Sequence, residues 1–433
     1  MQGEPGQPGA QGYLRQCIAR EMAAAGGWLP FERFMALALY APGLGYYARG
    51  AAVFGRGPGD GSDFVTAPLL SPRFGATLAR QLAQALAATG TDEIWEFGAG
   101  DGTLAAQLLA ALDKDQTWTA VVFDGEGTPS TPPAPARCAA TAVARGDDGT
   151  HPNTEGAFGR DGSGPQCPGF GVCAQPRTVR YHIVEVSAVL RQRQAQRLTA
   201  WAPRVTWHDR LPDVLQGVLV GNEVLDAMPV TLLHRVGGQW HERGVAWDAA
   251  AARFVWTDRP TDKRPPVEVE GTHDYLTEIH PQAEAFVRTV GQRLQRGAAF
   301  FIDYGFPERE YYHPQRAMGT LMCHRAHRAD ADPLADVGDK DITAHVNFTG
   351  IALAAQEAGL QVLGYTSQGR FLLNAGLLDG LDTAPLPERA AALKLVHEHE
   401  MGELFKVIAL APAVSAQGWM PLGFVHGDRT HTL

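Results

Sequence analysis

The stretch Glu96-Phe-Gly-Ala-Gly-Asp-Gly102 decides the expected fold of this 433-residue chain. It follows a short apolar run, which predicts a strand, and it leads into residues 101–112, where leucines recur at helical spacing. Gly98, Gly100 and Gly102 therefore lie at a strand-to-helix turn, where bare backbone can approach a ligand beside a helix N-terminus. A tight turn with no ligand is the plain alternative.

The spacing of these glycines narrows the kind of ligand. A dinucleotide fingerprint needs G-x-G-x-x-G, but Thr103 occupies the position of its third glycine. The shorter G-x-G-x-G spacing favours a nucleoside that has no pyrophosphate to hold. Glu96 adds a negative charge before the loop, which suits the ammonium group of a methionine moiety.

An acidic residue follows on the next predicted strand, residues 181–186, which ends at Glu185. A carboxylate at the tip of the second strand can accept both hydroxyls of a ribose. It normally lies about 20 residues after the glycine loop, but here a stretch rich in Gly, Pro, Ser and Thr intervenes. A solvated surface glutamate is the alternative interpretation.

Three polar residues, Asn222, Glu223 and Asp226, follow the apolar strand at 217–221, so we expect them at the carboxyl edge of the sheet. One helical turn would place Glu223 and Asp226 on the same side. Such a carboxylate pair can hold a protonated guanidinium through its forked N–H donors. The alternative is that both side chains only cap the following turn.

Further candidates for substrate binding come from another strand end and from loops. Asp303 and Tyr304 end a core strand, Tyr46 lies in a glycine-rich loop, and His324 and His345 flank a long loop. We expect no metal site, because arginines accompany the histidines and the five cysteines include no C-x-x-C pair.

Strands that alternate with helices predict an α/β fold with a largely parallel, doubly wound sheet. Composition shifts and turn residues predict the domain organisation. The expected parts are a disordered tail at 1–12, an N-terminal helical lobe at 13–90, a main domain at 91–411, a disordered insertion at about 124–178, a β-meander at about 230–270, a lid loop at about 306–345 and a C-terminal tail at 412–433.

Composition excludes several function classes. A formal net charge of -10 argues against a nucleic-acid binder, which would show a basic surface, but permits a basic protein substrate. The N-terminal residues lack the basic and apolar regions of a signal peptide, and no apolar run approaches the length of a membrane span. We therefore expect a cytoplasmic protein without membrane insertion.

Several motifs in one order resemble the MidA-like family of class I S-adenosylmethionine-dependent methyltransferases. They are Phe31-Glu-Arg-Phe-Met-Ala-Leu-Ala-Leu-Tyr40, Gly45-Tyr-Tyr47, Asp63-Phe-Val-Thr-Ala-Pro68, Glu96-Phe-Gly-Ala-Gly-Asp-Gly102, Glu185-Val-Ser187, Asn222-Glu-Val-Leu-Asp-Ala-Met-Pro229, Ile302-Asp-Tyr-Gly305 and Asp341-Ile-Thr-Ala-His345. The family includes bacterial proteins and the mitochondrial arginine methyltransferase that assists complex I assembly. The resemblance spans nearly the whole chain outside the N-terminal tail and the insertion.

The resemblance implies a Rossmann-like, mostly parallel sheet with an N-terminal helical lobe and inserted substrate-binding elements. It also implies S-adenosylmethionine as cofactor and a protein arginine as acceptor, in the mitochondrial relatives on a complex I subunit that becomes symmetrically dimethylated. The positions that match the family's cofactor site are Gly98, Gly100, Gly102 and Glu185, those that match a loop closing over the cofactor are Thr66 and Pro68, and those that match the acceptor site are Asn222, Glu223 and Asp226.

Two departures from the family pattern leave other functions open. Leu69 stands where the family usually has an acidic residue, and the insertion is foreign to the family. A small-molecule methyltransferase on the same fold is one alternative, because a fold does not fix its substrate. A non-catalytic assembly or binding protein that retains the cofactor site is the other.

Overall fold

The computed structural model describes residues 10–49, 65–114, 122–123, 129–130 and 178–433. Residues 1–9 and nearly all of the expected insertion at about 124–178 lie outside this description. The chain divides into two compact units, residues 1–120 with 178–433, and residues 121–177. In the smaller unit, β3 (Val122–Phe123) and β4 (Pro129–Ser130) pair antiparallel.

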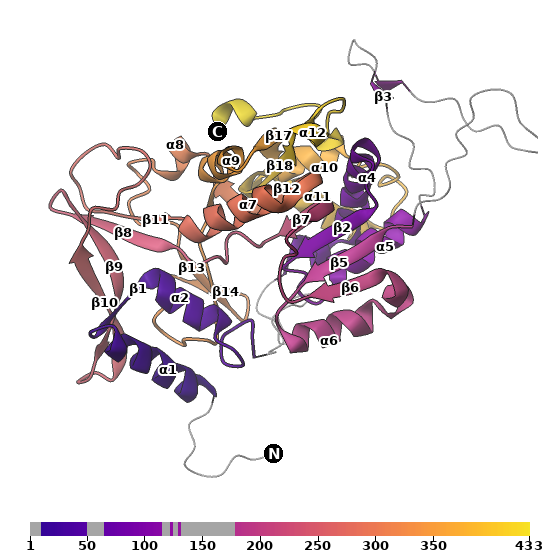
Figure 1. Cartoon of the computed structure of the whole chain (residues 1–433). Coiled ribbons are helices and arrows are strands. Elements are labelled where there is room, and N and C mark those ends of the chain that lie inside the picture. The colour runs from indigo at the N-terminus through magenta and orange to yellow at the C-terminus, as the bar shows by residue number, and fades with distance from the viewer. Residues whose placement is uncertain (1–9, 50–64, 115–121, 124–128, 131–177) are drawn as a thin grey trace, which may run out of the picture. The chain divides into compact units, whose positions relative to one another are not determined.

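The larger unit is built on an eight-stranded sheet in the order β17-β18-β12-β7-β2-β5-β6, with β16 paired to the end of β12 (Figure 1). The strands are β2 (Glu93–Phe97), β5 (Arg180–Val184), β6 (Val205–His208), β7 (Leu215–Asn222), β12 (Leu294–Phe306), β16 (Val346–Asn347), β17 (Leu360–Ser367) and β18 (Phe405–Pro412). Pairing from β6 to β12 is parallel, and β18 runs antiparallel to both of its neighbours. The predicted α/β class is confirmed, and β2 lies at the switch point of the strand order, where such sheets bind ligands.

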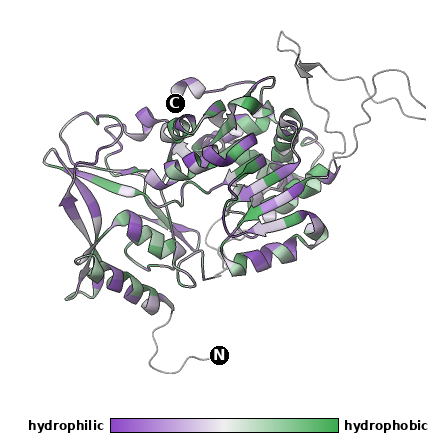
Figure 2. Cartoon of the chain, viewed as in Figure 1, coloured by the Kyte–Doolittle hydropathy of each residue, from purple (hydrophilic) through white to green (hydrophobic). Residues whose placement is uncertain are grey.

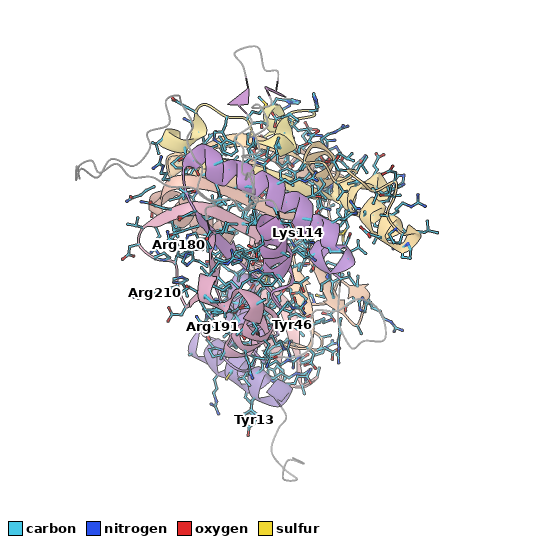
Figure 3. The ribbon with its side chains drawn as sticks, turned by 90° about the vertical axis from the view of Figure 1, so that its right-hand side faces the viewer. Tyr13, Tyr46, Lys114, Arg180, Arg191 and Arg210 are labelled. Atoms are coloured by element: carbon cyan, nitrogen blue, oxygen red, sulfur yellow. The ribbon has the colours of Figure 1, made fainter. Side chains whose placement is uncertain are left out.

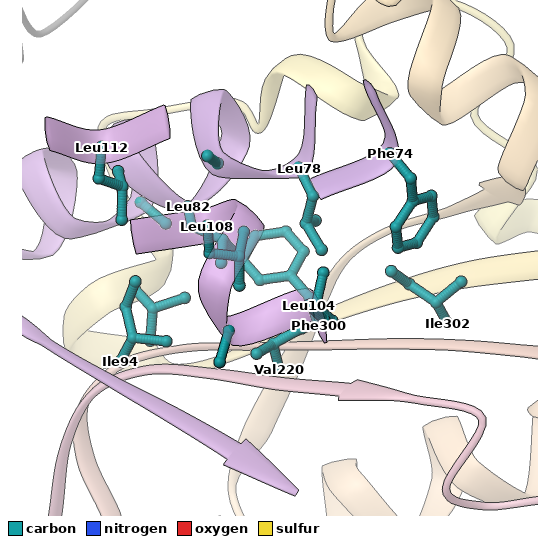
Figure 4. Close-up of a cluster of buried hydrophobic side chains, with 14 of the residues drawn as sticks. Phe74, Leu78, Leu82, Ile94, Leu104, Leu108, Leu112, Val220, Phe300 and Ile302 are labelled. Carbon is teal, nitrogen blue, oxygen red and sulfur yellow. The ribbon is translucent and has the colours of Figure 1, made fainter. Parts of the chain in front are cut away.

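Strand residues alternate between two apolar layers, as a sheet covered on both faces requires. Ile94 and Phe300 face one layer, whereas Trp95 and Phe301 face the other. Figure 4 shows the first layer, where α4 and α5 side chains meet β2, β7 and β12. Helices α4 (Pro72–Thr89), α5 (Thr103–Lys114), α10 (Gln368–Asn374) and α11 (Leu386–Val396) contribute to the first layer, and α7 (Pro281–Arg293) and α9 (Phe348–Glu357) to the second.

A second, antiparallel sheet forms a separate lobe of this unit, in the order β1-β9-β8-β11 with β10 paired to β9. Its elements are α1 (Ala10–Ala24), β1 (Trp28–Pro30), α2 (Phe31–Tyr40), β8 (Thr231–Val236), β9 (Gln239–Asp248), β10 (Arg253–Pro260) and β11 (Tyr275–Ile279). Residues 230–270, expected as a β-meander, therefore supply most of this sheet. Helices α1 and α2 both contain hydrophobic and hydrophilic residues (Figure 2). Phe34 of α2 packs edge-on against Phe254 of β10, with ring centroids 5.3 Å apart.

The expected helical lobe at 13–90 is wrong as a single body. Its first half, α1 and α2, packs in the lobe just described, but Phe74 and Leu78 of α4 pack on the main sheet. The sequence shows helical spacing in both halves and does not show which sheet each helix covers. Ser71 is the N-cap of α4, where its side-chain oxygen accepts the Arg73 N–H at 3.3 Å.

The segments expected as a lid loop and a C-terminal tail both contain helices or strands. Residues 306–345 contain α8 (Glu308–Tyr311) and a three-stranded sheet of β13 (Met322–Arg325), β14 (Arg328–Asp330) and β15 (Asp341–Thr343). The C-terminal segment contains α12 (Ala413–Ala416), η3 (Leu422–Phe424) and η4 (Thr430–Thr432). Phe424 is buried in the core, and the Asp428 side chain accepts the Tyr365 N–H at 2.9 Å. The segment is thus bound along β17.

Candidate active site

A cavity of about 1050 Å³ opens at the carboxyl ends of β2, β5, β7 and β12. These ends gather at one edge because the four strands are parallel (Figure 1). The cavity volume lies at the upper end of the range for small-molecule sites, so it has room for a cofactor and part of an acceptor. The candidate residues that line it are Thr66, Pro68, Glu96, Gly98, Gly100, Glu185, Asn222, Glu223, Asp226, Tyr304, His324 and His345.

The glycine loop has the left-handed backbone that its composition indicates. Gly98, Gly100 and Gly102 have φ angles of 63°, 53° and 83°. A Cβ at Gly98 would lie 2.7 Å from Val224 Cγ2, so the loop approaches the turn after β7 closely. Gly98 and Gly100 line the cavity, but Gly102 does not: it packs against Gln194, whose Cα would lie 3.3 Å from an added Cβ.

Glu185 is nearly buried at the end of β5, with one edge in the cavity. Its Oε1 accepts the Ser187 N–H at 2.7 Å, and its Oε2 accepts Gln194 Nε2 at 3.3 Å. Burial raises the pKa of Glu185, while these hydrogen bonds act to lower it. An oriented carboxylate that still faces a cavity fits the expected partner of a ribose.

Gln194, on α6 (Ala188–Arg197), connects Glu185 with the glycine loop and with β6. Its Nε2 also donates to Gly100 O at 2.9 Å, and its Oε1 accepts Trp207 Nε1 at 2.9 Å. Our sequence reasoning missed this residue, although Leu190, Gln194 and Leu198 recur at every fourth position. That spacing places all three on the inner face of the helix, where Gln194 is fully buried.

Glu96 lines the same cavity and is 2% exposed. Its Oε2 accepts the Tyr181 hydroxyl at 2.7 Å. Burial raises the pKa of Glu96 to about 7, with the Tyr181 hydrogen bond acting in the opposite direction. A bound cation would favour the ionised carboxylate, as expected for a partner of an ammonium group.

The segment after β7 is a turn, so the expected helical pairing of Glu223 and Asp226 is wrong. Glu223 instead has a left-handed φ of 54°, which is strained for a residue with a side chain. Asp303 holds the turn: its Oδ2 accepts the N–H groups of Val224, Leu225 and Asp226 at 3.1, 2.9 and 3.3 Å. Both carboxyl groups still face the cavity.

Asp303 was expected to bind substrate, but it is 1% exposed and does not line the cavity. Tyr46, which is labelled in Figure 3, was expected there as well, but it is also buried and does not line the cavity. The neighbouring Tyr47 lines the cavity instead, donates to Asp341 Oδ1 at 2.9 Å and stacks on Tyr40. In both cases the sequence identified the segment, and the structure selects the adjacent residue.

The residues Asn222, Glu223, Asp226, Tyr304 and His345 line one side of the cavity, which we name the acceptor half after the site that the family resemblance implies. Asn222 Oδ1, Asp226 Oδ1 and His345 Nδ1 make no hydrogen bond within the described part of the chain. Asn222 Nδ2 donates to Glu223 Oε1 at 3.0 Å, which fixes the amide orientation. Buried polar atoms of this kind are normally paired, and a bound group that supplies N–H or O–H donors would pair the Asn222 and Asp226 oxygens.

Burial shifts the pKa values of the two carboxyl groups, Glu223 and Asp226, toward neutral pH. It raises the pKa of Glu223 to about 8, with the charge of Asp226 adding to the effect, and that of Asp226 to about 6. The Tyr304 hydroxyl acts in the opposite direction on Asp226. Burial also lowers the pKa of His345 to about 4, so this imidazole is neutral at physiological pH.

Thr66 and Pro68 belong to the short segment that opens α3 (Ala67–Leu70) and borders the cavity. The Ala67 N–H interacts with the Glu223 carboxyl, and Pro68 O accepts Gln107 Nε2 at 2.7 Å. The segment therefore connects the carboxylate turn to α5. Leu69 also lines the cavity, at the position where the family usually has an acid.

In the described part of the chain, no group of three or more His, Cys, Asp or Glu side chains could hold a metal ion. Within the same residues, every helix is too short or too polar to cross a bilayer.

The order of the parallel strands and the left-handed glycine loop after β2 are those of a class I methyltransferase fold. Comparison with known proteins agrees. Residues 173–366 match the family described as "Putative S-adenosyl-L-methionine-dependent methyltransferase". A crystal structure of a "likely methyl transferase" from Burkholderia thailandensis, bound to S-adenosyl-homocysteine, is 44% identical with a TM-score of 0.80, over 99% of this chain and 100% of that one.

The chain belongs to the MidA-like family of S-adenosylmethionine-dependent methyltransferases, as its motifs predicted, and S-adenosylmethionine is its cofactor. The mitochondrial protein arginine methyltransferase NDUFAF7 homolog of Drosophila melanogaster is 30% identical over 54% of this chain and 61% of its own length. The Danio rerio NDUFAF7 is 24% identical over 92% of this chain and 87% of its own. The match thus spans about three fifths of the fly relative.

Proposed function

We propose that this methyltransferase acts on an arginine of a protein substrate. The observation that supports this is a cluster of buried polar atoms beside the glycine loop. Asn222 Oδ1, Asp226 Oδ1 and His345 Nδ1 have no hydrogen-bond partner among the described residues, and Glu223 adds a carboxyl group. A guanidinium has five N–H donors and one positive charge, which suits such a cluster. A hydroxyl acceptor would supply one donor and no charge.

The other side of the cavity, lined by Glu96, Gly98, Gly100 and Glu185, is named the cofactor half, and its residues are assigned from their chemistry in the same way. We infer that Glu185 accepts the ribose hydroxyls, that Gly98 and Gly100 allow close approach of the nucleoside, and that Glu96 pairs with the methionine ammonium. Thr66 and Pro68 border this half, and Gly102 acts indirectly by letting the loop pack on Gln194. The neutral cavity glycines and acidic partners suit a cofactor with two positive groups.

The protein's contribution to the chemistry is alignment and proton uptake. S-adenosylmethionine supplies an electrophilic methyl group, so the S–CH₃ bond breaks as an N–CH₃ bond forms and S-adenosylhomocysteine leaves. The arginine nitrogen that gains the methyl group releases one proton. Glu223 and Asp226 hold the guanidinium in line, and a carboxyl group with a pKa near neutral is suited to accept that proton.

The test uses the full chain with methyl-labelled S-adenosylmethionine, a cell lysate, and two defined peptides that differ only by arginine or lysine. We expect label in polypeptides and in the arginine peptide, recovered as methylarginine on hydrolysis. Among the lysate proteins, a subunit of a respiratory complex is the proposed substrate, as the family resemblance implies. Labelling of metabolites without any polypeptide would establish the small-molecule alternative instead.

Two conservative variants separate catalysis from binding. Glu223→Gln and Asp226→Asn keep the side-chain shape, and we expect kcat/KM for the arginine peptide to fall about a hundredfold with little change in the Kd of S-adenosylmethionine. The matched controls are Glu398→Gln and Asp382→Asn, which are exposed and do not line the cavity. Full cellular function of Asp226→Asn with intact cofactor binding would favour a non-catalytic role.

A further inference from the structure

The mouth of the acceptor half bears exposed apolar side chains. Tyr40, Met322 and Leu404 are 42%, 36% and 42% exposed, and all three line the cavity. They come from the end of α2, the start of β13 and the residue before β18, so three segments distant in sequence meet there. Exposed apolar side chains that gather around one opening are typical of a binding surface.

Contacts place two of these residues, Tyr40 and Leu404, near the acidic cluster, and Met322 lines the same cavity. The Tyr40 hydroxyl donates to Ala227 O at 2.8 Å, in the turn that contains Asp226. Leu404 precedes Phe405, whose ring lies edge-on to Tyr304 at 5.3 Å. Tyr40 thus lies beside the turn of Asp226, and Leu404 is the chain neighbour of a residue that contacts Tyr304, whose hydroxyl interacts with the Asp226 carboxyl group.

Two other exposed apolar residues of the rim, Val186 and Val189, have a different position. Both follow Glu185 in the chain and line the cofactor half of the cavity. Their neighbours are therefore the nucleoside rather than the acceptor. Only the group formed by Tyr40, Met322 and Leu404, which we name the acceptor mouth, remains for the substrate among these exposed side chains.

We propose that the acceptor mouth binds the residues that flank the target arginine, and that these residues are apolar. The proposal rests on the proposed arginine methylation. Charge complementarity directs the guanidinium into the acidic cluster, which leaves the neighbouring residues of the substrate chain at the mouth. Acidic neighbours would lose hydration against apolar side chains without gaining a partner. Free arginine is disfavoured for the same reason, because its own ammonium and carboxylate groups would lie there.

The test measures binding and methylation separately. Fluorescein-labelled peptides with the cores Leu-Arg-Leu, Ser-Arg-Ser and Asp-Arg-Asp are titrated with the full chain saturated with S-adenosylhomocysteine, and Kd is read by anisotropy. We expect the leucine peptide to bind most tightly and the aspartate peptide most weakly. Tightest binding of the aspartate peptide would overturn the proposal.

Variants then locate the contact. Leu404→Asp and Met322→Asp should each raise the Kd of the leucine peptide about tenfold, since each loses one apolar contact. Leu386→Asp is the matched control, because Leu386 is 69% exposed in α11 and does not line the cavity. Unchanged S-adenosylhomocysteine binding in calorimetry shows that each variant is folded. Equal peptide binding by all three variants would overturn the proposal.

Methylation of the same peptides distinguishes the two proposals. A leucine peptide that binds at the mouth but acquires no methyl group contradicts arginine methylation and leaves the acceptor mouth supported. Methylation of all three peptides with equal kcat/KM supports arginine methylation and overturns the acceptor mouth.

Discussion

Replacing Gln194 with leucine tests whether the cofactor half of the cavity depends on a residue that does not line it. Gln194 donates to Gly100 O at 2.9 Å and to Glu185 Oε2 at 3.3 Å, and it accepts Trp207 Nε1 at 2.9 Å. Leucine is a good helix former of similar size, so the contact with Gly102 is retained. The change therefore removes three hydrogen bonds and little packing.

The expected magnitude follows from those bonds. Each net contribution is about 0.5–1.5 kcal/mol, and two of the three orient groups that face the cavity. Their loss together should weaken S-adenosylmethionine binding by about 1–3 kcal/mol, or roughly fivefold to 150-fold. The third bond, to Trp207, contributes to stability alone, so the melting temperature should fall by a few degrees.

Calorimetry with S-adenosylmethionine and thermal unfolding by circular dichroism measure the two effects. Gln368→Leu is the matched control. Like Gln194, Gln368 is fully buried in a helix and does not line the cavity, and it donates to Leu395 O at 3.0 Å. We expect the control to lose stability but not affinity. A Kd for Gln194→Leu within twofold of wild type, or an equal loss in the control, would refute the reasoning.

Three further predictions concern the loop and the carboxyl groups. Gly98→Ala places a Cβ 2.7 Å from Val224 Cγ2 on a left-handed backbone, so urea unfolding should show about 1–2 kcal/mol less stability; an unchanged midpoint would contradict this. Burial raises the pKa of Glu223 from 4.5 to about 8, so the free energy of unfolding of wild type should fall as the pH rises through that interval. Glu223→Gln should lose less stability between about pH 5 and about pH 8. Parallel curves of unfolding free energy against pH for the two proteins would exclude the buried, protonated Glu223. Tyr181→Phe removes the donor to Glu96, which raises the pKa of Glu96 further above about 7. The S-adenosylmethionine affinity of the variant should therefore be a few-fold below that of wild type at neutral pH, and this deficit should narrow as the pH rises toward about 8, where the ligand ammonium begins to lose its proton. A deficit independent of pH would argue against this role of Glu96.

Local patterns predicted the parts of the site that parallel strands bring together. The glycine loop, Glu185 and the Asn222–Asp226 segment each follow a strand, and the carboxyl ends of parallel strands meet at one edge whatever intervenes in sequence. The insertion between β2 and β5 therefore did not obscure the pairing of these two strands, which runs in register from Glu93 with Arg180 to Phe97 with Val184.

What the sequence did not predict depends on which way a side chain faces. Asp303 and Tyr304 are adjacent on β12, so they face opposite directions, and only the fold determines that Tyr304 faces the cavity. Tyr46 and Tyr47 are also adjacent, in a turn, and only Tyr47 lines the cavity. The lobe boundary was missed for a related reason: α2 and α4 have equally apolar faces, and tertiary packing alone assigns them to different sheets.

The energetics of the carboxylate turn relate these observations to function. A left-handed Glu223 costs about 1–2 kcal/mol, and the turn persists because Asp303 accepts three successive N–H groups, each worth about 0.5–1.5 kcal/mol. The hydrogen bonds offset the strain, and the result is a turn that directs both Glu223 and Asp226 into one cavity. A helix at the same position would have satisfied the backbone without the buried Asp303. Strain retained where carboxyl groups face a ligand cavity is typical of a functional site, and this supports the proposed acceptor role of the turn over a purely structural one.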